Sequence, residues 1–284
     1  KDLVRTFLEH AARLSPEARI ELLDRTGELA VGAADDAPAA FEAFREVALA
    51  QPTNERARQF CVEYAVAHDR VPEAVDILEH SAARLANAST SFALLIRATD
   101  LAEARLHDNA RQRTLLRTAV EWQPNDGHTV GRLVHVLVVL DELDAAVEYL
   151  LDGLVDPTQE IALGIELADA LVARGRTGDA DQVRGWVASR HPESSAAGAI
   201  RLSQARQRGD ARTVVQEIDA VLATGDPIEA VERLALVNEA AQACLALGDA
   251  AAALRRWMAA LDLDGSQVEV LRRSYDLAGK LGAT

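Results

Sequence analysis

The amino-acid sequence predicts an all-α fold in which antiparallel helix hairpins repeat along the chain as a solenoid. Of the 284 residues, 55 are Ala and 37 are Leu, which are strong helix formers. Aromatic residues make up 4% of the chain, and this shortage of strand formers argues against an all-β sandwich or barrel. The third observation is an internal repeat, because a helix–turn–helix pattern recurs about every 34 residues.

Three glycine-centred turns mark the repeat most clearly, at residues 174–176, 208–210 and 247–249. Each ends one helical pattern, and a second helix with apolar residues at i, i+4 and i+7 begins a few residues later. The pattern predicts seven units, at residues 21–54, 55–92, 93–126, 127–160, 161–194, 195–233 and 234–266. Position 20 of these units is Ala40, Ala74, Gln112, Ala146, Ala180, Val214 and Ala253.

Residues 1–20 are expected to form a partial unit that precedes the first complete one. Phe7 and Ala11 share a helix face there, as in the second helix of an earlier hairpin. The chain thus opens in the middle of a unit, and on Lys1, which favours excision from a longer array. First or second helices are expected to begin at four prolines, Pro16, Pro38, Pro72 and Pro227.

Two further segments need separate treatment. In the unit at 93–126, Asp100 and Gln112 stand where small residues are expected, so its register is expected to be shifted. Residues 267–284 are predicted to form a capping helix. Its inward face would carry Val268, Leu271, Tyr275 and Leu281, with Arg272, Arg273 and Asp276 facing solvent.

This pattern resembles the tetratricopeptide repeat (TPR) family over residues 21–284. The resemblance rests on small residues at positions 8, 20 and 27, a large apolar residue at position 24 and Pro at position 32 (Pro52, Pro124 and Pro192). It implies a right-handed superhelical solenoid that forms a single domain over residues 1–284. Small residues let two helices approach closely, and stacked hairpins bury a continuous core.

Charge and hydropathy exclude several classes of protein. The formal net charge of −15 is spread along the chain, so no nucleic-acid partner is expected. The longest apolar run, residues 133–140, is far shorter than the ~20 residues that span a bilayer, so no membrane insertion is expected. Cys61 and Cys244 are predicted to be free, which mildly favours a cytoplasmic location, with the periplasm as the alternative. Nearly all basic residues are Arg, a skew typical of high-GC bacterial genomes.

No catalytic or cofactor motif is present, so the sequence predicts no enzyme activity, no cofactor and no metal. His128 and His135 lie seven residues apart and share a helix face, but no third ligand accompanies them.

The resemblance also implies a binding face, since first helices in that family line a concave surface that contacts extended peptides at positions 2, 5, 9 and 12. In this chain the residues expected there are Arg56, Gln59, Glu63, Arg97, His128, His135, Asp169, Ser203, Arg206, Asn238 and Gln242. They are polar and of mixed sign, which favours a protein or peptide partner. The family's lysine- and asparagine-based carboxylate clamp is not matched, so a chaperone-tail ligand is disfavoured.

Two alternatives remain open at this point. The chain is also similar to the periplasmic TPR scaffolds of bacterial exopolysaccharide secretion machines, in which an acidic solenoid docks a polysaccharide-modifying enzyme and escorts a charged polymer. Alternatively, it is the targeting domain of a larger enzyme, such as a glycosyltransferase. The non-enzymatic interaction scaffold is the leading hypothesis.

Overall fold

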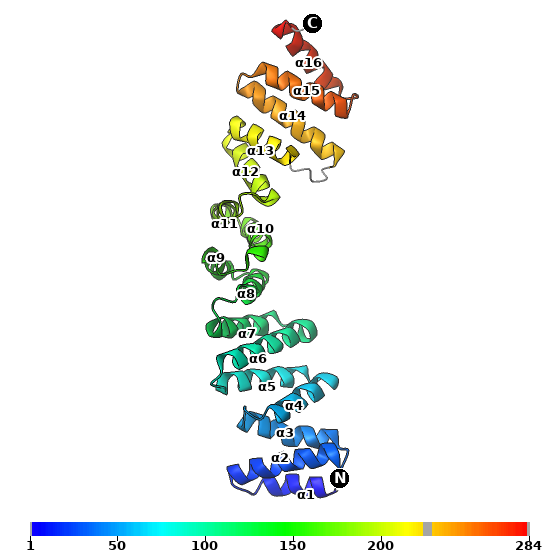
Figure 1. Cartoon of the computed structure of the whole chain (residues 1–284), viewed down its shortest axis with the longest axis vertical. Coiled ribbons are helices and arrows are strands. Elements are labelled where there is room, and N and C mark those ends of the chain that lie inside the picture. Colours follow the sequence, from blue (N-terminus) through cyan, green and yellow to red (C-terminus); the bar gives the residue numbers. More distant parts are fainter. Residues whose placement is uncertain (1, 224–228, 283–284) are drawn as a thin grey trace. The chain divides into compact units, whose positions relative to one another are not determined.

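The computed structural model describes residues 2–223 and 229–282, and in these residues it contains helices and no strand (Figure 1). The contacts divide the chain into two units, Lys1–Ala170 and Leu171–Thr284, where the sequence predicts one continuous domain. The division lies inside the helix Pro157–Ala173. The all-α hairpin repeat predicted from the sequence is confirmed.

The first unit contains the helices α1 (Asp2–Ala11), α2 (Pro16–Gly32), α3 (Ala37–Ala50), α4 (Glu55–Ala67), α5 (Val71–Arg84), α6 (Ala88–Leu101), the π-helical turn η1 (Ala102–Leu106), α7 (Asn109–Trp122), α8 (Gly127–Val139), α9 (Leu143–Leu151) and most of α10 (Pro157–Ala173). The second unit contains α11 (Thr177–Arg190), α12 (Ser195–Arg208), α13 (Ala211–Ala223), α14 (Ala230–Ala246), α15 (Ala250–Leu263) and α16 (Val268–Leu281). Even-numbered helices from α2 to α14 are the first helices of hairpins, and the odd-numbered helices that follow them are the second helices.

Each hairpin turn reverses the chain through one residue in the left-handed backbone region. In three turns that residue is glycine, at Gly175, Gly209 and Gly248, with φ of 74°, 66° and 80°. These are the three turns that the sequence marks most clearly. In the other four it is Asp35, Asp69, His107 or Asp141. Asp and His are among the residues that tolerate this region best, so their turns carry a weaker sequence signal than glycine.

Small residues sit where the hairpin helices cross, as the period of 34 predicts. The seven residues assigned to position 20 are each the fourth residue of a second helix, and all are buried. Five are Ala at 0% exposure, while Gln112 and Val214 are 4% and 6% exposed. Helix ends are held by side-chain caps, such as Asn54 at α4 and Asp126 at α8, whose side chains accept hydrogen bonds from backbone N–H groups.

Four first helices begin earlier than the sequence indicates. They start at residues 16, 88, 157 and 230, where the units are placed at 21, 93, 161 and 234. Pro16 and the Asn87 cap add about one turn at the N-terminus of α2 and α6. In α6 the buried small residue is Thr99 and not Asp100. The π turn η1 accounts for this shift of one residue, because a π turn inserts one residue between α6 and α7.

The predicted orientation of the last helix is wrong. Val268, Leu271 and Tyr275 are exposed, whereas Val270 and Ser274 are buried. The Ser274 hydroxyl donates a hydrogen bond to the Val270 carbonyl at 2.8 Å, which allows this polar residue to face inward. The predicted positions of the Leu281 side chain and of Pro227 lie outside the described residues.

The two cysteines are free and buried, as predicted. Cys61 lies on α4, and burial raises the pKa of its thiol to about 12. Cys244 lies on α14.

Candidate binding surface

All eleven residues that the sequence singles out lie on first helices. Helix α4 carries Arg56, Gln59 and Glu63, α6 carries Arg97, α8 carries His128 and His135, α10 carries Asp169, α12 carries Ser203 and Arg206, and α14 carries Asn238 and Gln242. Asn238 is half-buried and the other ten are exposed. They therefore form a polar surface on the first helices of each unit.

Two arginines of this set connect consecutive first helices. Arg56 on α4 forms an ion pair with Glu28 on α2. Arg206 on α12 donates two hydrogen bonds to Glu239 on α14, at 2.7 Å and 2.5 Å, and this hydrogen bonding raises the pKa of Arg206. A guanidinium group matches a carboxylate in shape and charge when both nitrogens bond. Both arginines thus help to fix neighbouring hairpins.

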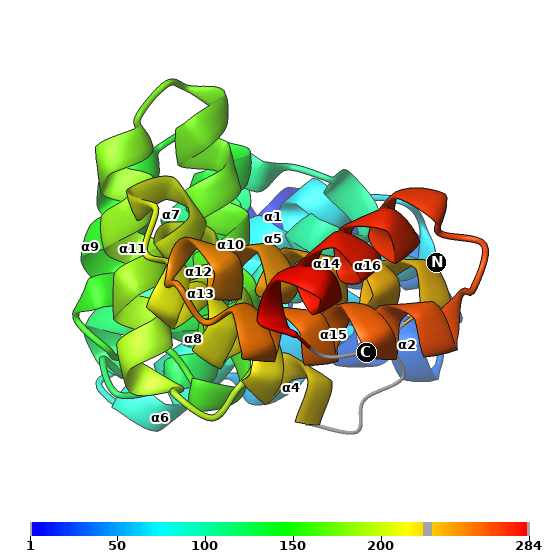
Figure 2. The same cartoon turned by 90° about the horizontal axis from the view of Figure 1, so that it is seen from above.

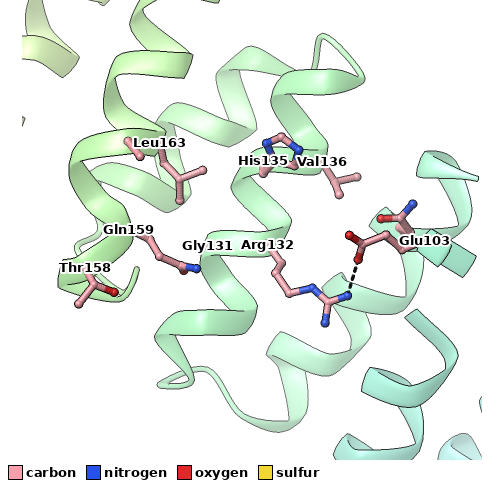
Figure 3. Close-up of a pocket in the computed structure, with 10 residues that line it drawn as sticks. Glu103, Gly131, Arg132, His135, Val136, Thr158, Gln159 and Leu163 are labelled. Atoms are coloured by element: carbon pink, nitrogen blue, oxygen red, sulfur yellow. Dashed lines mark hydrogen bonds and ion pairs between the residues drawn. The ribbon is translucent and has the colours of Figure 1, made fainter. Parts of the chain in front are cut away.

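A cavity of about 320 Å³ opens among η1, α7, α8 and α10 (Figure 3). Its apolar walls include Val136, Ala162 and Leu163. Its polar walls include Glu103, Arg132 and Gln159, and His135 also lines it. Of the residues expected from the sequence, the cavity contains His135 itself, and His128 lies next to its Gln159 wall.

Gly131 makes room for the Gln159 side chain. A Cβ atom at Gly131 would lie 2.3 Å from Gln159 Oε1, so a larger residue there would displace the amide. The amide nitrogen of Gln159 lies 3.2 Å from His128 Nδ1, while Oε1 is buried without a hydrogen-bond partner in the described structure. An unpaired buried acceptor costs about 1–3 kcal/mol, so a donor from a ligand would be stabilised there.

Arg132 supplies the positive charge of the cavity but is shared between two carboxylates. Its Nη2 atom lies 2.9 Å from Asp100 Oδ1 and 2.8 Å from Glu103 Oε2 (Figure 3 shows the bond to Glu103). The side chain of Arg132 is only 19% exposed. Glu103 belongs to the π turn, which carries its carboxylate toward α8. One cation between two anions leaves this wall with an excess of negative charge.

His135, about one turn after Arg132 on the same face of α8, contacts α10. Its Nδ1 atom is 2.9 Å from Glu166 Oε1 and 3.0 Å from Oε2. With Glu166 the cavity gains another carboxylate close to its rim. The local electrostatics therefore favour a donor or cation as the guest.

A second, open hollow lies on α4. It is lined by Glu55, Arg56, Gln59, Phe60 and Glu63, with a volume of about 480 Å³. Gln59 Nε2 donates a hydrogen bond to Glu63 Oε1 at 2.9 Å. Three of the residues expected from the sequence thus share one hollow. A single helix supplies all of the walls of this hollow, so it is more open to solvent than the cavity between α8 and α10.

Arg132, Gln159 and Glu103 were not anticipated from the sequence. Two signals pointed to them: Gly131 in the middle of a helix, and Gln112, which lines the cavity where other units have Ala or Val. Gly131 leaves room for the Gln159 side chain. Gln112 places a polar side chain at a position where the other units have a small or medium apolar residue.

Among the described residues there is no group of three or more His, Cys, Asp or Glu side chains placed to hold a metal ion. No helix in the described segments is both long and apolar enough to cross a membrane.

The repeat itself, a pair of antiparallel helices with alanine at five of the seven crossings described above, resembles the tetratricopeptide repeat. No family model and no curated protein matches the chain. Among solved structures, it is similar to the C-terminal part of a TPR repeat-containing protein from Cytophaga hutchinsonii, with 15% identity, coverage of 88% of this chain and 98% of that chain, and a TM-score of 0.46.

Two other solved structures share the repeat architecture. One is YrrB, a TPR protein with an unusual peptide-binding site, at 15% identity over 62% of this chain and 88% of that chain, with a TM-score of 0.37. The other is the TPR2AB domain of yeast Sti1 in complex with an HSP90 peptide, at 12% identity over 92% of this chain and 99% of that chain, with a TM-score of 0.42.

Proposed function

We propose that the chain is a non-enzymatic scaffold that binds a protein or peptide partner on its first helices, with the cavity between α8 and α10 as the point where a partner side chain enters. The observation that carries this proposal is the buried, unpaired Oε1 of Gln159 in a cavity of about 320 Å³. Polar groups in a mostly apolar cavity are typical of specific ligand sites.

The walls favour one kind of side chain. Val136 and Leu163 suit an aliphatic stem, whereas Gln159 Oε1 and the Glu103 carboxylate accept hydrogen bonds. Lysine and arginine have this combination of stem and donor. The net charge of −15 adds long-range attraction for a basic segment. We therefore expect a partner segment with a cationic residue at a fixed position.

The test is selection of peptides from a random displayed library against the full chain, followed by affinity measurements on Ala162→Trp. Ala162 is exposed and lines the cavity, so the indole should fill it without disturbing the core. Ala93→Trp is the matched control, because Ala93 is exposed on α6 and lines none of the cavities described.

The expected result is a set of peptides with a recurring Lys or Arg that bind the Ala93→Trp variant normally and lose at least tenfold in affinity for Ala162→Trp, about 1.4 kcal/mol. Peptides that bind both variants equally, or that share no cationic position, would contradict the proposal. The exopolysaccharide scaffold and the targeting domain of a larger enzyme stay predictions, as do the cytoplasmic and periplasmic locations.

A further inference from the structure

Helices α8 and α10 contact each other through side chains that lie 31 residues apart in sequence (both helices are labelled in Figures 1 and 2). His135 contacts Glu166, and His128 contacts Gln159 about two turns away. The two contacts differ in kind. A carboxylate offers acceptors alone, whereas the Gln159 amide carries an acceptor and a donor on the same carbon. What His128 presents to the amide therefore decides which end of it faces away from the histidine.

The Gln159 amide has its nitrogen on His128 and its oxygen on Gly131. Nε2 lies 3.2 Å from His128 Nδ1. Because an amide nitrogen only donates, Nδ1 is the acceptor of this hydrogen bond and carries no proton. Oε1 lies 2.3 Å from the position of a Cβ atom at Gly131 and is buried without a hydrogen-bond partner in the described structure. The free acceptor at the cavity wall thus depends on the contact at the other end of the amide.

A proton on His128 Nδ1 reverses this arrangement. The Nδ1–H group would meet the N–H groups of Gln159, and two donors that face each other form no hydrogen bond. A turn of the amide by about 180° about its last side-chain torsion restores the bond, because Oε1 then accepts from Nδ1–H. Amide oxygen and nitrogen are nearly equal in size, so the turned amide fits the same space. Nε2 then faces Gly131, and the cavity wall offers a donor in place of an acceptor.

We propose that His128 is the specificity-determining residue of the cavity between α8 and α10, because its protonation selects which end of Gln159 faces the ligand. While Nδ1 carries no proton, the cavity binds a cationic donor. When His128 is an imidazolium, the amide presents its own donor and that ligand is released. This inference rests on the proposed function, in which a cationic side chain enters the cavity.

On the α10 side, one carboxylate acts on His128. Hydrogen bonds from Thr158, and to a smaller extent the charge of His128, lower the pKa of the Asp156 carboxyl. Asp156 in turn favours the imidazolium form of the histidine. Glu166, the other carboxylate that α10 directs at α8, is in contact with His135.

On the α8 side, the influences oppose this carboxylate. His128 is in the first turn of α8, where the helix dipole disfavours a positive charge. Asp126 caps this helix and offsets part of that effect. Arg132 follows one turn later, but Asp100 and Glu103 of the preceding hairpin already bind its guanidinium. Helix α7 contributes the uncharged Gln112 to the cavity. Opposing influences of this kind allow both protonation states of His128.

The orientation of the amide is measured by nuclear magnetic resonance of the full chain without ligand, at about pH 8 and about pH 5.5, because histidines change charge in this range. At the higher pH, the side-chain N–H protons of Gln159 should show a nuclear Overhauser contact with the His128 ring. At the lower pH, a contact with the α protons of Gly131 should replace it. His128→Phe should abolish this change. His135→Phe should retain it, because His135 bonds to Glu166 and not to the amide.

Binding is measured with N-acetylarginine methylamide, which has an aliphatic stem and a guanidinium that stays charged at both pH values. The affinity of the wild type should fall at least about tenfold from about pH 8 to about pH 5.5. Protonation and probe binding should oppose each other by the same factor. Gln159→Leu keeps the charge of His128 but has no amide to turn, so its affinity should change less than about threefold. Gln159→Glu has acceptors on both oxygens and should bind the probe at both pH values.

Three results would overturn the role of His128. One is an amide contact that stays the same at both pH values. Another is a tenfold loss of affinity in Gln159→Leu, which would assign the effect to charge repulsion alone. The third is the same loss in His128→Phe. Failure of the wild type to bind the probe at about pH 8, with the amide still turning, would contradict the proposed function itself. Circular dichroism of each variant verifies that it is folded.

Discussion

Gly27→Ala perturbs a close contact between α2 and α3 in the first unit. Gly27 is buried in α2, and a Cβ atom there would lie 2.6 Å from Phe44 Cε1 and 2.7 Å from Cδ1 and Cζ. Carbon atoms pack at about 3.5–4.0 Å, so the ring would have to move by about 1 Å. Phe44 is 1% exposed and its ring centroid lies 5.3 Å from that of Phe60, so the movement disturbs neighbours in the core.

The magnitude follows from two opposing effects. Overpacking of a core costs about 1–3 kcal/mol, whereas replacing glycine by alanine inside a helix stabilises it by about 1 kcal/mol. Gly27→Ala is therefore expected to lower the free energy of unfolding by about 0–2 kcal/mol. Gly32→Ala is the control in the same helix, because no atom lies within 4 Å of its Cβ position. That variant should be more stable than the wild type, by up to about 1 kcal/mol.

The assay is urea denaturation followed by circular dichroism. It is repeated with Phe44→Leu introduced into the wild type and into the Gly27→Ala variant. The smaller side chain should relieve the contact, so the two substitutions should couple favourably by about 0.5–3 kcal/mol. If Gly27→Ala were as stable as Gly32→Ala, or if Phe44→Leu cost the same with and without it, the packing of α2 on Phe44 described above would be wrong.

Three further substitutions or reactions test other parts of the structure. Arg70 donates hydrogen bonds to Glu73 at 2.6 Å and 2.9 Å and lowers the pKa of Glu73. The ion pair therefore stabilises the fold above the unfolded pKa of about 4.3 and is lost as the pH falls through the lower folded pKa. Glu73→Gln should cost up to about 1 kcal/mol at pH 7 and approach the wild type below about pH 3 in urea titrations; a pH-independent difference would contradict the pair. Because burial raises the pKa of Cys61 to about 12, iodoacetamide at about pH 8 should alkylate this thiol only after denaturation, and rapid labelling of the folded protein would contradict its burial. Gly131→Ala should leave the fold intact but move the Gln159 amide away from His128, which side-chain amide resonances of Gln159 would report; unchanged resonances would contradict the 2.3 Å approach.

The hairpins could be predicted from sequence because their crossings depend on residues close together in the chain. Ala40, Ala74 and Ala146 each have a fixed distance from a turn, and small size is the only property the crossing requires. The orientation of α16 could not be predicted in this way. Its more apolar stripe, Val268, Leu271 and Tyr275, faces outward, and Ser274 is buried because its hydroxyl bonds to a backbone carbonyl of its own helix. Hydrophobic periodicity alone favours the wrong face.

The cavity could not be predicted for a different reason. Its polar groups come from separate helices, and their meeting depends on how successive hairpins stack. Glu103 reaches Arg132 from the π turn, and Gln159 reaches His128 only because residue 131 is glycine. The first-helix positions given by the family resemblance identified exposed residues such as Arg56. They could not show that Arg56 is engaged by Glu28 from the preceding hairpin.

The use of arginine follows from these same contacts. Arg132 bridges Asp100 and Glu103, Arg111 bridges Asp76 and Glu79, and each pair of carboxylates belongs to the preceding hairpin. In the second unit, Arg256 bonds to both oxygens of Asp219, at 2.6 Å and 2.7 Å. A planar guanidinium group bonds to two oxygens in a fixed geometry, whereas an ammonium group is a point charge that does not fix an angle.

Arginine therefore adds direction to hairpin interfaces that are otherwise apolar, which gives its predominance over lysine a structural role. Each cross-link also neutralises a positive charge that would otherwise face solvent. With 30 basic and 45 acidic residues, the charges that remain for a partner are mainly acidic. The surplus of acidic residues attracts a basic segment at long range, and the carboxylates at the cavity attract a cationic side chain at short range. Both favour a partner segment with a cationic side chain.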